Sequence, residues 1–156
     1  MQGLFFRDFL NNHIPEIIKE IYLERIYDKY AKEGMTVLDI GANYGYFSYW
    51  AALKGASKVY AIEPSLDHQE VLKTMMIHNH LQETIVPISV ALSNFNGEGT
   101  FYKNENTTMY SLNPATGQAH LGTETVTVMT AKTLWDTFEI GHINLAKIDV
   151  EGSEFD

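Results

Sequence analysis

Hydrophobic positions along the chain alternate between two spacings, which predicts helices and strands in turn. In the amino-terminal segment Ile14, Ile17, Ile18 and Ile21 recur at helical intervals, so a helix is expected over about residues 15–32. Short continuous apolar runs, typical of strands buried on both faces, follow further along the chain. The order of these elements predicts right-handed crossovers and a parallel sheet. The expected strands of this sheet are residues 35–40, 58–62, 85–92 and 143–150, and the expected helices are residues 46–54, a segment that starts at Ser65, and residues 131–138.

The segment between the third and fourth of these strands has a different pattern. Gly97 and Gly99 flank a turn before a short strand at residues 100–103, and residues 125–129 alternate with the period of a half-buried strand. We expect these two strands to pair antiparallel, with a polar surface loop over residues 104–122.

The predicted fold class is α/β, in three layers, with an amino-terminal helical segment (residues 1–34) before one sheet domain (residues 35–156). Only six residues follow the last expected strand. In a doubly wound sheet that strand would be an exposed edge, which favours aggregation. We therefore expect the carboxy-terminal strands to be missing, so that the domain is truncated after strand four. A partner or a second copy that covers the edge is the alternative.

Composition narrows the class of protein. The 156 residues are 45% hydrophobic, enough for one core, and the formal net charge of −9 with only 11 scattered Lys and Arg argues against nucleic-acid binding. Without cysteine the chain has neither disulfides nor a thiolate nucleophile. No run approaches the ~18 apolar residues of a membrane span, and no signal-peptide pattern is present, so a cytoplasmic protein that does not bind membranes is expected.

The first strand of the sheet has a carboxylate near its end and is followed by a glycine-containing turn. Asp39 lies near the end of that strand, the turn runs from Gly41 to Gly45, and Glu63 directly follows the second strand. A tight first turn together with an acid after the next strand is how α/β proteins hold a cofactor that contains adenosine.

Details of the turn favour S-adenosyl-L-methionine over a nicotinamide dinucleotide. A pyrophosphate requires G-x-G-x-x-G, but Asn43 stands at the second glycine position and its side chain would crowd a diphosphate. Asp39 would repel a pyrophosphate, whereas it could serve the ammonium group of S-adenosylmethionine directly or through water. Glu63 is then expected to accept hydrogen bonds from both ribose hydroxyls.

Four segments carry a resemblance to a known family. Residues 37–48 (V-L-D-I-G-A-N-Y-G-Y-F-S) resemble the first motif of class I S-adenosylmethionine-dependent methyltransferases, and more narrowly that of the FkbM family. Residues 62–64, 90–94 and 147–154 (K-I-D-V-E-G-S-E) are similar to later segments of the same family, in the same order. The resemblance implies a Rossmann-like methyltransferase sheet that binds S-adenosylmethionine over residues 35–156. It also implies O-methylation of a small-molecule hydroxyl, such as that of a sugar or polyketide-type metabolite.

Site residues follow from the turn and from this resemblance. Asn43 could bind the ligand carboxylate or its own backbone, and Ser93 and Asn94 could contact adenine or stabilise an ordinary turn. Asp149 or Glu151 is expected to act as the general base for an alcohol acceptor; alternatively, Glu151 binds backbone N–H groups. The expected cofactor-binding residues are Asp39, Gly41, Ala42, Asn43, Gly45, Glu63, Ala91, Ser93, Asn94 and Asp149.

Other functions stay open at this stage. One is an NAD(P)-dependent oxidoreductase on a Rossmann-like sheet, and another is a non-catalytic domain that binds the cofactor. The six histidines form no ligand set and are expected on the surface, and no metal site is predicted. A homo-oligomer is left open.

Overall fold

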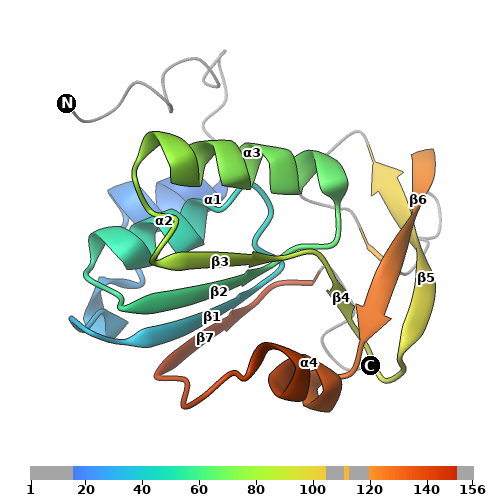
Figure 1. The fold of residues 1–156 in the computed structure, drawn as a ribbon. Helices are drawn as coiled ribbons and strands as arrows, with labels where there is room; N and C mark the ends of the chain where they lie inside the picture. Colours follow the sequence, from blue (N-terminus) through green and yellow to red (C-terminus); the bar gives the residue numbers. More distant parts are fainter. Residues whose placement is uncertain (1–15, 105–110, 113–119, 151–156) are drawn as a thin grey trace.

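The computed structural model describes residues 16–104, 111–112 and 120–150, which form two sheets (Figure 1). The larger sheet is parallel, as predicted, with strand order β3-β2-β1-β7. Its strands are Ile85–Ile88 (β3), Lys58–Ile62 (β2), Thr36–Ile40 (β1) and Leu145–Ile148 (β7). The smaller sheet, of order β4-β6-β5, contains Ala91–Leu92 (β4), His120–Met129 (β6) and Gly97–Asn104 (β5).

Helices cover both faces of the parallel sheet, which gives the expected three layers (Figure 1). Helices α2 (Tyr46–Leu53) and α3 (Leu66–His78) lie on one face, and α4 (Ala131–Phe138) lies on the other. Thr130 caps α4, since its side chain accepts a hydrogen bond from Thr133 N at 3.2 Å. Ser65, where the helical segment was expected to start, is the N-cap residue of α3, but its side chain makes no capping hydrogen bond.

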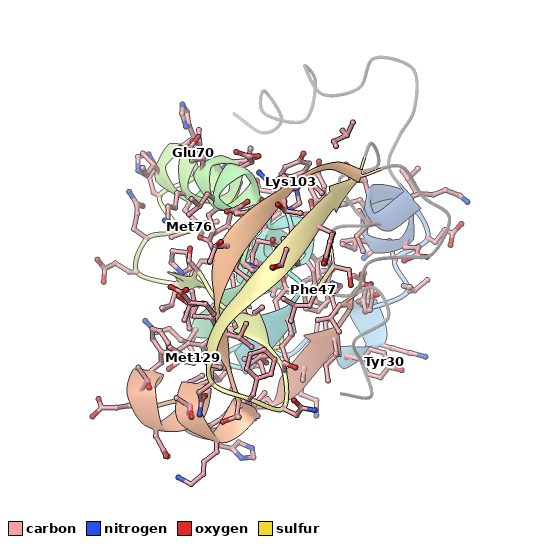
Figure 2. All side chains as sticks on the ribbon, turned by 90° about the vertical axis from the view of Figure 1, so that its right-hand side faces the viewer. Tyr30, Phe47, Glu70, Met76, Lys103 and Met129 are labelled. Carbon is pink, nitrogen blue, oxygen red and sulfur yellow. The ribbon has the colours of Figure 1, made fainter. Side chains whose placement is uncertain are left out.

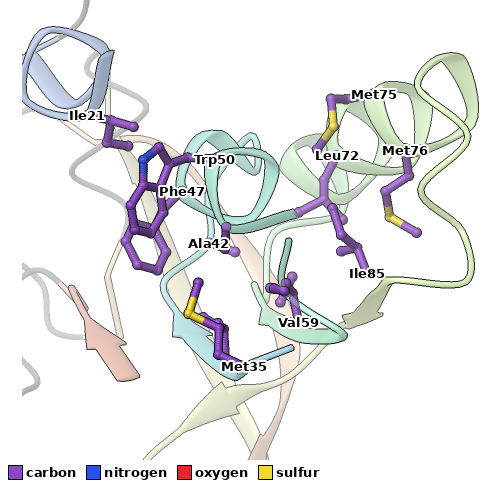
Figure 3. Packing of buried hydrophobic residues seen from close by; sticks show 14 residues of the cluster. Ile21, Met35, Ala42, Phe47, Trp50, Val59, Leu72, Met75, Met76 and Ile85 are labelled. Carbon is purple, nitrogen blue, oxygen red and sulfur yellow. The ribbon is translucent and has the colours of Figure 1, made fainter. Parts of the chain in front are cut away.

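Alternation along the strands divides the core between the two faces. Val37 of β1 packs with α2 and α3, whereas Leu38 and Ile40 pack with Leu134 of α4. In Figure 3, residues of α3 such as Leu72 lie over the sheet, and residues of α2 lie beside the amino-terminal segment. Burial of these side chains, at about 25 cal/mol per Å² of apolar surface, is what holds both helix layers to the sheet.

The amino-terminal helix predicted over residues 15–32 is wrong in its length. The structure has α1 (Glu16–Ile18), a π-helical turn η1 (Lys19–Leu23) and a 3₁₀ turn η2 (Asp28–Tyr30). The helical run ends because Arg25 adopts a φ of 57°, in the left-handed region. Ile21 nevertheless faces inward, at 1% exposure, beside Phe47 and Trp50 (Figure 3). Residues 1–15 lie outside the described part of the chain.

The third strand predicted over residues 85–92 is split between the two sheets. β3 ends at Ile88, whose carbonyl accepts hydrogen bonds from Glu63 N at 3.0 Å and from Gln69 Nε2 at 3.1 Å. The chain then continues as β4, which pairs in parallel with β6. The apolar run is continuous in sequence because both parts contribute to a core: Ile88 of β3 and Leu92 of β4 pack in one cluster, and Ala91 of β4 packs in the cluster of the smaller sheet.

The antiparallel pair predicted in the irregular region is confirmed. β5 and β6 pair antiparallel, with Thr100 opposite Thr125, and both strands are longer than expected. Of the loop expected at residues 104–122, residues 105–110 and 113–119 lie outside the description. Within the described ranges, none of the helices combines the length and the apolar character that crossing a membrane requires.

Tyr22 of η1 ties the amino-terminal segment to α2, since its hydroxyl donates to Tyr46 O at 3.0 Å. Burial, followed by the neighbouring Tyr49 and Tyr46, raises the pKa of this phenol in the folded protein. We expect the free energy of unfolding to fall above about pH 10, where the unfolded chain begins to ionise Tyr22 and the folded chain does not. Because the folded-state pKa is raised, this stabilisation is complete below pH ~10 and declines as the pH rises, by about 1.4 kcal/mol per pH unit.

Urea unfolding between about pH 8 and about pH 11 measures this decline. Tyr22→Phe should lower the stability at neutral pH by about 1 kcal/mol, through the lost hydrogen bond, and should make the alkaline decline shallower. Tyr30→Phe, in the same segment, is the matched control. A decline of equal slope in the wild type and in Tyr22→Phe would contradict the assignment to Tyr22.

Candidate cofactor site

The predicted residues that end β1, β2 and β7 come together at one edge of the parallel sheet. These strands run in the same direction, so their carboxyl ends share an edge, and Figure 2 faces that side of the molecule. From β1 the chain proceeds to β2 and β3 on one side and returns as β7 on the other, with the connecting helices on opposite faces. Open α/β sheets bind ligands where the strand order reverses in this way. The turn after β1 and the end of β7 are therefore the candidate site.

The turn between β1 and α2 contains three residues in the left-handed backbone region. Gly41, Asn43 and Gly45 have φ values of 75°, 51° and 85°. Gly41 N and Ala42 N both donate to Ile62 O, at 3.0 and 2.9 Å, which ties the turn to the end of β2. Gly45 N donates back to Ala42 O at 2.8 Å and closes the turn. The turn is therefore held in place by backbone bonds to β2.

Of the two roles left open for Asn43, the structure shows the bond to its own backbone. Asn43 Oδ1 accepts from Tyr44 N at 2.7 Å, and Asn43 N donates to Glu63 Oε2 at 2.9 Å. Every N–H from Gly41 to Gly45 thus donates within the protein. A ligand carboxylate at this turn has to compete with these bonds or bind beyond them.

Gly41 is required by the approach of β7 to the turn. A Cβ on Gly41 would overlap the backbone carbonyl of Asp149, whose N–H donates to Ile40 O at 3.0 Å. At Gly45 the neighbouring atoms belong to side chains, which can move: a Cβ would lie 2.9 Å from Leu72 Cδ1 and 3.0 Å from Met75 Cε. The glycine at position 41 thus brings Asp149 against the turn.

Asp39 is fully buried, at 0% exposure, beneath the turn. Its Oδ2 accepts from Ser48 Oγ at 2.7 Å, and its Oδ1 lies 3.6 Å from Lys147 Nζ. No ligand atom can touch Asp39 in this arrangement without displacing a protein group. Burial raises the pKa of Asp39, although Lys147 and Ser48 act in the opposite direction.

Glu63 is buried as well, at 4% exposure, and its carboxylate already accepts from several protein donors. Oε2 accepts from Asn43 N, and Oε1 accepts from Ser65 N at 2.9 Å and lies 3.2 Å from His68 Nδ1. A carboxylate has about four acceptor positions, so two ribose hydroxyls require at least one of these contacts to be shared or released. Glu63 therefore already joins the turn after β1 to the start of α3 without a ligand.

Two buried polar residues of α3 were not expected from the sequence. The prediction of surface histidines is wrong for His68, which is 1% exposed, contacts Glu63 and packs edge-on against Tyr44 at 4.8 Å between ring centroids. Gln69 donates from Nε2 to Glu63 O at 2.8 Å and to Ile88 O at 3.1 Å. The sequence signal available was their position, because both lie in the first turns of the helix that follows Glu63.

The residues predicted to contact adenine lie along β4 and the turn after it. Ala91 is buried in the core of the small sheet with Val128, Ser93 N donates to Met129 O at 3.1 Å, and Asn94 is exposed. The Ser93 bond continues the pairing of β4 with β6. Their contact with adenine stays a prediction.

Asp149 is the accessible carboxylate at the end of β7. Its side chain is 50% exposed, and Oδ2 lies 3.3 Å from Lys147 Nζ. Glu151, the other predicted base, lies outside the described residues. Within the described ranges, no group of three or more His, Cys, Asp or Glu side chains is arranged so that it could hold a metal ion.

An ion pair and a hydrogen bond link the antiparallel pair of β5 and β6 to α3, close to Glu63. Lys103 Nζ of β5 pairs with Asp67 Oδ2 at 2.7 Å and with Glu124 Oε2 at 3.0 Å, and Glu124 Oε1 accepts from Leu66 N at 3.0 Å. The hydrogen bond to Asp67 is the main cause that raises the pKa of Lys103. Figure 2 shows this pair of strands, with Lys103 labelled, crossing in front of the parallel sheet.

Sheet order, the turn after β1 and the acids that follow β2 and β7 define a Rossmann-like domain of the S-adenosylmethionine-dependent methyltransferase class. The family model described as the methyltransferase FkbM domain matches residues 39–156, which is most of the chain. The chain therefore belongs to the FkbM methyltransferase family, and the resemblance of its motifs to that family is confirmed.

Individual relatives match shorter parts of the chain. Protein arginine N-methyltransferase PRMT10 of Arabidopsis thaliana is 36% identical over 82 residues, or 51% of this chain and 21% of the relative, so the chain spans about a fifth of that relative's length. The crystal structure of an Arabidopsis thaliana protein arginine methyltransferase 10 is 27% identical, with a TM-score of 0.40 over 50% of this chain and 26% of that one. The Trypanosoma brucei PRMT1 enzyme–prozyme complex with AdoHcy is 23% identical, with a TM-score of 0.36 over 44% and 25%. Because both TM-scores are low, the family assignment rests on the match over residues 39–156.

Proposed function

We propose that this protein binds S-adenosyl-L-methionine at the carboxyl ends of β1, β2 and β7 and transfers its methyl group to a small-molecule hydroxyl. The observation that carries this proposal is the position of the turn after β1, which lies at the reversal of strand order between Glu63 and Asp149. The FkbM family match supports the reaction class.

Each end of the cofactor is assigned to its own part of the site. Glu63 accepts from the ribose hydroxyls, Ser93 and Asn94 lie toward adenine, and the turn from Gly41 to Gly45 borders the methionine moiety. Asp39 acts from below the turn, through Lys147, because it is buried. These assignments follow from the strand ends at which the residues lie.

S-adenosylmethionine supplies an activated methyl group, and the protein supplies alignment and a proton acceptor. When bound, the cofactor would offer its methyl carbon to the acceptor oxygen, and its sulfur would keep the electron pair of the bond that breaks. The hydroxyl proton goes to a carboxylate, for which Asp149 is the exposed candidate.

A sugar or polyketide-type metabolite is the proposed acceptor, from the family resemblance. The 36% identity to a protein arginine N-methyltransferase makes a guanidinium group the second candidate.

Cytoplasmic location and homo-oligomer formation also stay predictions.

Titration calorimetry with S-adenosylhomocysteine tests cofactor binding. We expect a dissociation constant in the micromolar range, about −8 kcal/mol, and no comparable binding of NADH. Exposed Glu70, on α3, provides the control Glu70→Ala, which should bind like the wild type. Binding of NADH but not of S-adenosylhomocysteine would favour an oxidoreductase instead.

Methyl transfer is then measured with radiolabelled cofactor, hydroxylated small molecules and an arginine-containing peptide. Label in a hydroxylated product supports the proposal, and label in the peptide alone supports the second candidate. Cofactor binding without transfer to either would leave a binding domain that is not catalytic.

A further inference from the structure

Lys147 lies where β7 faces the carboxylate beneath the turn. In the register of the parallel pair, Lys147 is opposite Asp39. Asp149 directly follows β7, its side chain contacts Lys147, and its backbone carbonyl faces Gly41. One ammonium group therefore lies among the turn, the buried acid and the exposed acid.

The ammonium group of Lys147 contacts the buried acid, the exposed acid and the turn. Lys147 Nζ lies 3.6 Å from Asp39 Oδ1, 3.3 Å from Asp149 Oδ2 and 3.3 Å from Gly41 O. The lysine side chain is only 9% exposed and Asp39 is fully buried, so the contact between these two groups is shielded from bulk water, whereas Asp149 is 50% exposed. Such a lysine differs from a surface ion pair, whose partners stay hydrated and contribute little.

The charges around Lys147 favour its ionised form. Burial alone lowers the Lys147 pKa, but Asp39, Asp149 and the nearby phenol of Tyr27 outweigh burial, and the pKa lies above its usual value. The ring of Tyr27 is fixed by packing against Phe47, at 5.0 Å between ring centroids. Lys147 is therefore charged at neutral pH and offsets the charge of fully buried Asp39.

We propose that Lys147 is a positioning residue that holds Asp149 and the carbonyl of Gly41 in the arrangement that binds the cofactor, in addition to neutralising Asp39. Its effect on the ligand rests on the proposed function, whereas its effect on Asp149 does not. A lysine that only neutralised Asp39 would become dispensable once the charge of Asp39 was removed, and this difference makes the proposal testable.

Three variants separate the two roles. Lys147→Met keeps the length of the side chain but leaves Asp39 buried without a counter-charge, so its melting temperature should fall. Asp39→Asn combined with Lys147→Met removes both charges and keeps a group that can bond Ser48, so its melting temperature should return toward that of the wild type. Lys132→Met, on exposed α4, is the matched control and should behave like the wild type.

The positioning role of Lys147 is measured in two ways. Calorimetry gives the affinity for S-adenosylhomocysteine, and nuclear magnetic resonance follows the exchange of backbone amides. We expect S-adenosylhomocysteine to bind to the double variant at least about tenfold more weakly than to Asp39→Asn alone, which is the lower end of the loss that removal of an orienting partner causes at metal sites. We also expect the Asp149 N–H, bonded to Ile40 O, to exchange at least about tenfold faster. The Val59 N–H, bonded to Thr84 O inside the sheet, reports global opening and should not change.

Wild-type affinity and wild-type Asp149 exchange in the double variant would overturn the proposal, because Lys147 would then only neutralise Asp39. Weaker affinity with unchanged exchange would overturn it as well, since Asp149 would not have moved. If the wild type fails to bind S-adenosylhomocysteine, the proposed function fails, and the exchange of Asp149 alone decides the role of Lys147.

Discussion

Gly41→Ala is expected to lower the free energy of unfolding by about 3 kcal/mol or more and to weaken cofactor binding. The new Cβ would overlap the carbonyl of Asp149. The position of a Cβ is fixed by the backbone and the Asp149 carbonyl belongs to the backbone, so no side-chain rotation can relieve the overlap, and overpacking of this kind costs about 1–3 kcal/mol. The φ of 75° adds about 1–2 kcal/mol for any residue with a Cβ. For a domain of this size the melting temperature should fall by roughly 10 °C.

Gly34→Ala separates these two costs. Gly34 has nearly the same φ, 76°, but a Cβ there would meet nothing within 4 Å. Its replacement should therefore cost only the backbone term, about 1–2 kcal/mol. Urea unfolding of both variants measures the difference, which reports the contact between the turn and β7. Equal losses in the two variants would show that this contact does not stabilise the fold.

Local patterns were sufficient to predict most of the parallel sheet and its helices. Residues 58–62 and 131–138 form a strand and a helix with the predicted bounds, because each is a short apolar run or an amphipathic segment between clear turn residues. Two predictions failed where backbone geometry decides the outcome. The left-handed conformation at Arg25 shortens the first helix, and β3 ends at Ile88 because the chain then crosses to the smaller sheet, where β4 pairs with β6.

The location of the candidate site at the strand ends was predicted from the sequence. The hydrogen bonds and ion pairs within the site were not predicted. The acids near the end of β1 and directly after β2 could be recognised from their spacing, but their burial could not, because it depends on residues brought together by the fold. Ser48 and Lys147 become partners of Asp39 only through the helix packing and the strand register. The spacing of Lys147 and Asp149 offers one usable signal, since residues two positions apart in an extended segment project to the same side.

Glu63→Ala is expected to weaken S-adenosylhomocysteine binding by at least about 100-fold, or about 2.7 kcal/mol. Two ribose hydroxyls would lose a charged acceptor, and hydrogen bonds to charged groups contribute about 1.5–3 kcal/mol each. The same substitution leaves the N–H groups of Asn43 and Ser65 without their acceptor, so stability should fall by about 2–4 kcal/mol. Calorimetry and urea unfolding measure the two losses.

Glu63→Gln separates the effect on ligand binding from the effect on stability, because it preserves the size of the side chain and one carbonyl acceptor. An amide NH₂ cannot accept from either backbone N–H, so one of these two bonds is still lost and about half of the stability loss should remain. Affinity should stay strongly reduced, because the charge that binds both hydroxyls is gone. If Glu63→Gln binds S-adenosylhomocysteine as tightly as the wild type, Glu63 acts only within the protein, by joining the turn to α3. The ribose would then be bound by another residue, and the assignment of the cofactor to these strand ends would lose its strongest contact.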